Sequence, residues 1–283
     1  MFAIASKGDD LLLYNKCLKL FFSGTAGLVI LRCLLKILYV DNQSGFYNSG
    51  EFVTLIFNIL TILTVAGVII LTLIVKDQQP AKIRGGKWLE LFSIILGIAI
   101  LFVSIGALIK TMAIDTSLPV VNALPQWILL IEHFLGILSG MAFLYLAFFM
   151  HSGAKAGSLK GISSLTVVLW QAFMVIERFI SFQQVTTVSD QLFETLFMVL
   201  FILFMLYHTK CAGDIAANRS ACIRRALLTA VFGITVSVGQ LAATGVFGSA
   251  ITGPSIERSI VILASSVYAV CFALNIAANT EEV

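Results

Sequence analysis

Charged residues are scarce in this sequence. Asp, Glu, Lys and Arg make up only 12% of the 283 residues, whereas 59% are hydrophobic. An ordinary soluble domain has about 25% charged residues, so a surface with so few charges could not keep a chain of this size in water. The apolar residues also run in long blocks, which excludes the alternating strands of a transmembrane barrel. The composition therefore predicts an all-α, polytopic transmembrane helix bundle.

A helix needs about 20 apolar residues to cross the hydrocarbon core of a bilayer. Eight blocks reach or approach that length, and they form a single membrane domain over residues 1–283. The last two are rich in Ala, Ser, Thr and Gly, so seven spans remain an alternative. The expected spans are residues 18–40, 52–75, 88–112, 126–150, 162–182, 191–209, 226–248 and 258–278.

Proline, histidine and cysteine are also rare, and their positions restrict the chemistry. None of the four prolines falls within a span, which weighs against the interrupted helices of many transporters. The three histidines lie on different segments, and the five cysteines lie in spans or in segments expected to be cytosolic. We therefore expect no disulfide, no metal and no cofactor. Zinc-protease, nucleophile-elbow and Walker signatures are missing as well, so no catalytic residue is predicted and an intramembrane enzyme ranks third among the functional classes.

Basic residues are distributed unevenly between the connecting segments. Thirteen of the eighteen lie in the N-terminal segment and in the second, fourth and sixth connections, whereas the alternate connections are acidic. Lys and Arg stay on the cytoplasmic side of a membrane, so both termini are expected in the cytosol and eight spans are favoured over seven. The first ten residues lack the pattern of a cleavable signal peptide, and the first span is expected to act as its own insertion signal.

Several ionisable residues fall inside the expected spans. A charge at the centre of a membrane helix costs about 2.5–3.5 kcal/mol, which makes each one a candidate for function. With the predicted orientation all of them lie in the outer half of the membrane. They are Arg32, Lys36, Glu132, His133, Glu177, Arg178 and Glu194.

Three interpretations of these charges remain open. They could form ion pairs that fix the order of the helices, with Lys36 and Glu194 reaching toward the headgroups. They could line an outward-facing polar pocket, in which Arg32 and Arg178 hold an anionic group and the glutamates a cationic one; Gln171 shares a helix face with Arg178 and would give it a polar approach. Proton coupling through Glu132 and His133 is the third interpretation.

Glycines within the spans predict close helix packing. Small residues let backbones approach one another where lipid offers no hydrophobic driving force. Gly136 and Gly140 form a Gly-x-x-x-Gly pair on the same face as Glu132, which would turn that carboxyl group toward another helix. Gly233 and Gly239 have the same expected role in the seventh span.

The segment Asp41-Asn42-Gln43-Ser44-Gly45-Phe46-Tyr47, which follows the first span, resembles a short stretch in uncharacterised polytopic membrane proteins of bacteria. The resemblance covers this loop and the layout of the spans. It implies a bacterial plasma (cytoplasmic) membrane as the location and brings no activity with it.

Two functional classes follow from the sequence. The favoured one is a transporter or ligand-binding permease component for a small zwitterionic or anionic solute, because the intramembrane charges are gathered together. The alternative is a non-catalytic sensor or scaffold that binds a protein partner through its basic cytosolic loops. Those loops are short and lack interleaved aromatic residues, so they suit lipid headgroups, and nucleic acid is not expected as a partner.

Overall fold

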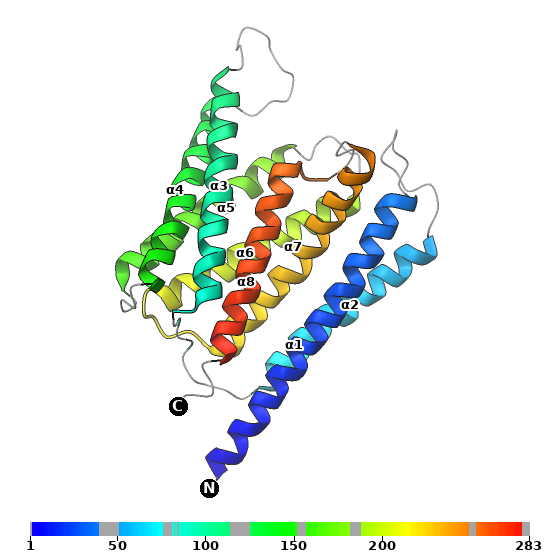
Figure 1. The fold of residues 1–283 in the computed structure, drawn as a ribbon, viewed down its shortest axis with the longest axis vertical. Coiled ribbons are helices and arrows are strands. Elements are labelled where there is room, and N and C mark those ends of the chain that lie inside the picture. Colours follow the sequence, from blue (N-terminus) through cyan, green and yellow to red (C-terminus); the bar gives the residue numbers. More distant parts are fainter. Residues whose placement is uncertain are drawn as a thin grey trace.

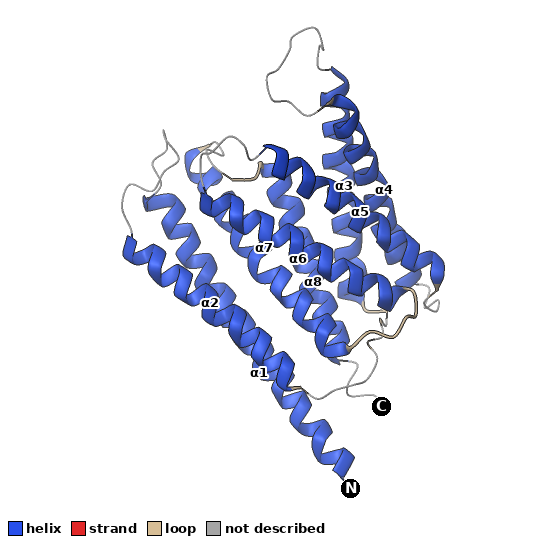
Figure 2. Ribbon diagram, turned by 180° about the vertical axis from the view of Figure 1, so that it is seen from behind, coloured by secondary structure: helices blue, strands red, loops and turns tan. Residues whose placement is uncertain are grey.

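In a computed structural model of this chain, the described residues are 2–39, 51–75, 81, 83, 85–113, 125–151, 157–181, 188–248 and 253–278. They form eight α-helices and one π-helical turn, without a β-strand (Figure 2). All eight helices are long and apolar enough to cross a membrane. The prediction of eight spans is therefore confirmed over the alternative of seven. The helices are α1 (Phe2–Leu34), α2 (Glu51–Ile74), α3 (Lys87–Ala113), α4 (Gln126–His151), α5 (Ser158–Ser181), α6 (Val188–Ala212), α7 (Arg219–Phe247) and α8 (Ile256–Ala278), and the π-helical turn Leu35–Tyr39 continues α1.

The two helices with the least typical membrane composition lie at the centre of the bundle. In the most apolar window of α7, 72% of the residues are buried, and in α8 67%, against 22% in α2. A helix surrounded by other helices needs small side chains for close packing more than it needs large apolar ones. The many Ala, Ser, Thr and Gly residues of these spans are thus explained by their central position.

Consecutive helices pack as pairs, α1 with α2, α3 with α4, α5 with α6 and α7 with α8. The α1–α2 hairpin packs mainly on α7, along one flank of a bundle made by the other six helices (Figure 1). Within that bundle α8 also packs on α3, and α6 on α7. Because α1 begins and α8 ends at the same end of the molecule (Figure 1), an even number of crossings is consistent with both termini on one side.

A buried polar chain joins three helices of the six-helix bundle. His208 on α6 shares hydrogen bonds with Ser164 on α5, at 3.2 Å from Nδ1, and with the hydroxyl of Tyr268 on α8, at 2.7 Å from Nε2. All three side chains are inaccessible to solvent. Buried polar groups that satisfy one another in this way hold helices in a fixed register.

Helix starts differ most from the expected bounds at α1, which begins at Phe2 and not near Leu18, and at α7. Helix α7 begins at Arg219 and not near Ala226, because the Asn218 side chain accepts a hydrogen bond of 3.1 Å from the Ala221 backbone N–H and caps the helix. Asn is among the residues favoured at that position. Arg219, Arg224 and Arg225, which were expected in a cytosolic loop, therefore lie on the first two turns of α7.

The glycines of α4 and α7 lie at close helix contacts. A Cβ on Gly140 would lie 2.9 Å from the carbonyl oxygen of Gly97 on α3, and one on Gly136 would meet Ser104 and Trp170. A Cβ on Gly233 would overlap both Ser266 on α8 and Phe197 on α6. These contacts hold α3 against α4, and α7 against α6 and α8, at distances that only a glycine permits.

The segment Asp41–Tyr47, which carries the resemblance to bacterial membrane proteins, lies outside the described residues. The same is true of Lys76, Lys82, Arg84 and Lys155 in the basic connections.

Candidate functional site

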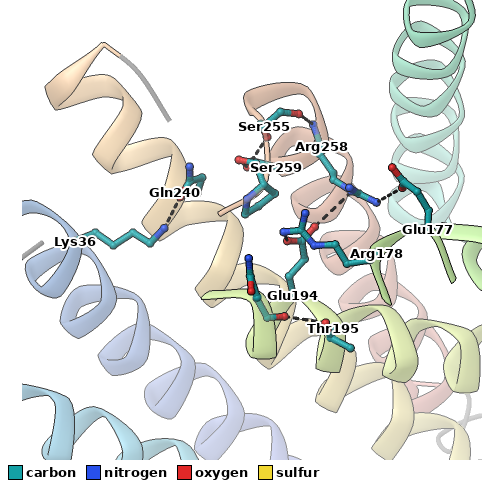
Figure 3. A network of polar contacts seen from close by, with 11 residues as sticks. Lys36, Glu177, Arg178, Glu194, Thr195, Gln240, Ser255, Arg258 and Ser259 are labelled. Carbon is teal, nitrogen blue, oxygen red and sulfur yellow. Dashed lines mark hydrogen bonds and ion pairs between the residues drawn. The ribbon is translucent and has the colours of Figure 1, made fainter. Parts of the chain in front are cut away.

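Charged side chains from α1, α4, α5, α6 and α8 meet at one end of the bundle, where the π-helical turn and the starts of α6 and α8 lie. Figure 3 shows two parts of this cluster: Lys36 with Gln240 on one side, and Glu177, Arg178, Glu194 and Arg258 on the other. We call these residues, together with Arg32 and Glu132, the charge network.

Glu194 is the centre of the second part. Its side chain is fully buried, although it lies close to the start of α6. Its Oε2 accepts a hydrogen bond of 2.6 Å from Nη2 of Arg178 on α5, and its Oε1 lies 3.4 Å from Nε of Arg258 on α8. A buried carboxylate is tolerated when it is paired in this way, and the pairing joins α5, α6 and α8.

Arg258 extends the network to two further carboxyl groups. Its Nη2 donates a hydrogen bond of 3.4 Å to Oε2 of Glu177. Glu177 also lies within electrostatic range of Glu132 on α4.

Lys36 and Gln240 connect the α1–α2 hairpin to the bundle. Both side chains are buried, and the Lys36 ammonium donates a hydrogen bond to the Gln240 side-chain oxygen on α7. Gly253 lies directly over this contact, in a left-handed conformation with φ of 96°; a Cβ there would lie 3.2 Å from Lys36 Nζ. Lys36 is also within electrostatic range of Arg32 and Glu194.

Arg32 lies one helical turn before Lys36 and points to the same interface. It is 2% exposed, and its guanidinium carbon lies 5.3 Å from the ring centroid of Phe57 on α2 and 5.5 Å from that of Phe193 on α6. Arginine over aromatic rings gains a cation–π attraction that is larger when water is excluded. Gly239 provides the space, since a Cβ there would lie 2.6 Å from Cγ of Arg32.

The π-helical turn Leu35–Tyr39 contains Lys36. Such turns are rare and occur mostly as single insertions at functional positions. Here the change of winding begins three residues after Arg32, and Lys36 is its second residue. No pattern in the sequence indicated this turn.

Six of the predicted residues therefore belong to the charge network, and two lie apart from it. His133 faces α3, with its Nε2 3.0 Å from the Thr111 hydroxyl. Gln171 is buried on α5, seven residues and about 10 Å along the helix axis from Arg178. Glu132 and His133 both lie within electrostatic range of Glu177, and proton coupling through them stays a prediction.

Sequence reasoning missed Arg258, Gln240 and Lys110. Arg258 is the first residue of the last expected span, whereas in the structure it is the third residue of α8 and pairs with Glu177 and Glu194. Its depth in the expected span was therefore no signal. A lone glutamine and a lysine near a span end, such as Gln240 and Lys110, carried no signal either.

The described side chains of the network include four cations (Arg32, Lys36, Arg178, Arg258) and three carboxyl groups (Glu132, Glu177, Glu194). No group of three or more possible metal ligands is found within the described part of the chain.

No family model matches this sequence, and comparison with curated proteins and with solved structures finds no similar chain.

Proposed function

We propose that this protein is a transporter, or the ligand-binding component of one, for a small solute that carries a carboxylate or phosphate group. The observation that carries the proposal is that two buried cations, Arg32 on α1 and Lys36 in the π-helical turn that continues it, lie where the α1–α2 hairpin meets the bundle, within electrostatic range of each other.

The two buried cations favour an anionic ligand between the hairpin and the bundle. Burying a charge is costly unless an opposite charge accompanies it. An anionic group between the hairpin and the bundle would lie beside the guanidinium and ammonium groups of Arg32 and Lys36, which are the usual protein partners of carboxylates and phosphates. A zwitterion would use the same cations and place its ammonium group toward Glu194 or the Glu132–Glu177 pair.

The position of the cations supports binding linked to movement. Arg32 and Lys36 belong to the α1–α2 hairpin, which packs mainly on α7, whereas the carboxyl groups belong to the six-helix bundle. Ligand sites in membrane proteins commonly lie between packed helical units. A small displacement of the hairpin along α7 would open and close the space around Lys36, and a contact with a ligand would replace the Lys36–Gln240 hydrogen bond.

We place the protein in the bacterial plasma membrane with both termini in the cytosol, which turns the charge network outward. The support for this orientation is the distribution of basic residues among the connections.

The experiment is ligand binding by the purified full chain, followed by uptake into proteoliposomes. Acetate, glycine and inorganic phosphate serve as the simplest carboxylate, zwitterion and phosphate, and then larger members of each class are tested. Arg32→Gln is expected to weaken binding of the active class about tenfold or more, because a hydrogen bond to a charged group contributes about 1.5–3 kcal/mol.

Arg219→Gln is the matched control. Arg219 is also a buried arginine, 5% exposed, but it lies at the start of α7, at the other end of the bundle. Equal losses of binding in the two variants, or melting temperatures that fall in parallel with binding, would show that Arg32 stabilises the fold and would contradict the proposal.

A further inference from the structure

A groove runs along α3 toward the start of α8, on the outer surface of the bundle. Its volume is about 500 Å³, and it is lined by Phe102, Val103, Ile105, Gly106, Ala107, Ile109, Lys110, Ser255 and Glu257. The lining from Phe102 to Lys110 covers about 12 Å along the α3 axis. The groove is therefore a long trough with apolar walls and a polar end.

The trough faces the surroundings of the protein and not the charge network. Phe102 is 75% exposed and Ile109 is 63% exposed, as expected for side chains that contact lipid. Gly106 forms part of the floor, and a Cβ added there would meet no atom within 4 Å. The space above this glycine is therefore unfilled by the protein.

The polar end carries one charge of each sign. Lys110 Nζ lies 3.8 Å from Glu257 Oε1, and the two side chains are 78% and 49% exposed. Glu257 also accepts a hydrogen bond from the Ser255 side chain. An exposed ion pair of this length contributes little to stability, so both groups keep the capacity to contact a ligand.

We propose that this groove holds one acyl chain of a zwitterionic glycerophospholipid, with its phosphate on Lys110 and its ammonium group on Glu257. The charge pattern of the polar end, a cation and an anion side by side above an apolar trough, is the complement of that lipid. An anionic lipid would match only Lys110. This site is separate from the proposed solute site and does not depend on it.

The headgroup must supply most of the selectivity. An acyl chain gains no hydrophobic free energy by moving from lipid to an apolar groove, because both surroundings are equally apolar. Retention then depends on the shape of the trough and on contacts of the headgroup with Lys110 and Glu257. The shape of the trough and the contacts of Lys110 and Glu257 with the headgroup are therefore tested separately.

The trough is tested with Gly106→Trp, and Gly245→Trp is the matched control. A Cβ on Gly245 of α7 also meets nothing within 4 Å, but this glycine is not part of the groove. The purified full chain is loaded with dioleoyl phosphatidylethanolamine, and bound lipid is counted by native mass spectrometry at increasing collision energy. Gly106→Trp is expected to lose one retained lipid, with apparent affinity lowered about tenfold or more, whereas Gly245→Trp keeps it. Gly106→Leu fills less of the trough and gives the same test if the tryptophan variant does not fold.

The charges are tested with Glu257→Gln and Lys110→Gln, using phosphatidylethanolamine, phosphatidylglycerol and decanol as probes. The native chain is expected to prefer phosphatidylethanolamine. Glu257→Gln should lose that preference because its remaining charge suits an anionic headgroup, and Lys110→Gln should weaken both phospholipids.

Two outcomes would overturn the proposal. One is equal lipid retention by the native chain, Gly106→Trp and Gly245→Trp. The other is a native chain that retains decanol as well as phosphatidylethanolamine, which would show that the groove takes any apolar chain.

Discussion

Lys36 on α1 donates a hydrogen bond to Gln240 on α7, across a separation of 204 residues in the sequence. The contact is buried, and it ties the hairpin that carries the cations to the centre of the six-helix bundle (Figure 3). A neutral amide holds the ammonium group in position without neutralising it.

Gln240→Glu is expected to weaken anion binding about tenfold or more, because a carboxylate beside Lys36 supplies the negative charge that the ligand would otherwise bring. The folded state should not lose stability, since the variant adds an opposite charge to a buried cation. Ligand binding and thermal unfolding of the purified protein measure the two effects. Gln171→Glu is the control, because Gln171 is a buried glutamine on α5 outside the charge network. Unchanged binding in Gln240→Glu would separate Lys36 from the solute site.

Glu194→Gln is expected to lower the free energy of unfolding by about 3 kcal/mol, because it leaves the Arg178 and Arg258 guanidinium groups beside a neutral, buried partner. Chemical unfolding in mild detergent gives the value. Glu90→Gln is the comparison: Glu90 pairs with His151 at 2.9 Å, but the His151 side chain is 75% exposed, so its loss should cost less than about 1 kcal/mol. Similar costs for the two variants would show that Glu194 is not the centre of the buried pairing.

Gly140→Ala is expected to destabilise the protein by about 1–3 kcal/mol, because the added methyl group would meet the Gly97 carbonyl oxygen and the Leu101 side chain on α3. Backbone atoms cannot rotate away, so α3 and α4 would have to separate. Gly245→Ala has free space around the new methyl group and should leave stability unchanged or raise it by about 0.5 kcal/mol through its higher helix propensity. Thermal unfolding of both variants in one detergent makes the comparison, and an equal response would remove the packing argument.

Cysteine labelling in intact cells checks the orientation. Ile215, in the α6–α7 connection, and Lys110, near the end of α3, are both well exposed, at 60% and 78%. A membrane-impermeant maleimide applied from outside should label Lys110→Cys and leave Ile215→Cys unlabelled until the cells are opened. The native chain measures background labelling, and three of its cysteines, Cys17, Cys211 and Cys222, are buried. The reverse labelling pattern would place the charge network on the cytosolic side.

Prediction from the sequence was most successful for the class and number of the helices, because lipid restricts the backbone structures that can cross a membrane. A backbone in hydrocarbon must satisfy its own hydrogen bonds, so apolar blocks of sufficient length become helices, and eight such blocks gave eight helices. The ends were less predictable because local contacts decide them. The Asn218 cap moves the start of α7 back to Arg219, and no hydropathy value contains that information.

The sequence by itself determined the all-α class, the eight long apolar helices and the ionisable residues that lie within them, because each of these follows from residue type and block length. Only the tertiary structure decided which charges meet. It placed Arg258 between Glu177 and Glu194, set Gln240 against Lys36, turned His133 toward Thr111 and gave α7 and α8 the largest buried fractions. The physical reason is that the bilayer selects helices one at a time through transfer free energy, whereas their rotation and neighbours depend on packing contacts between residues far apart in the chain.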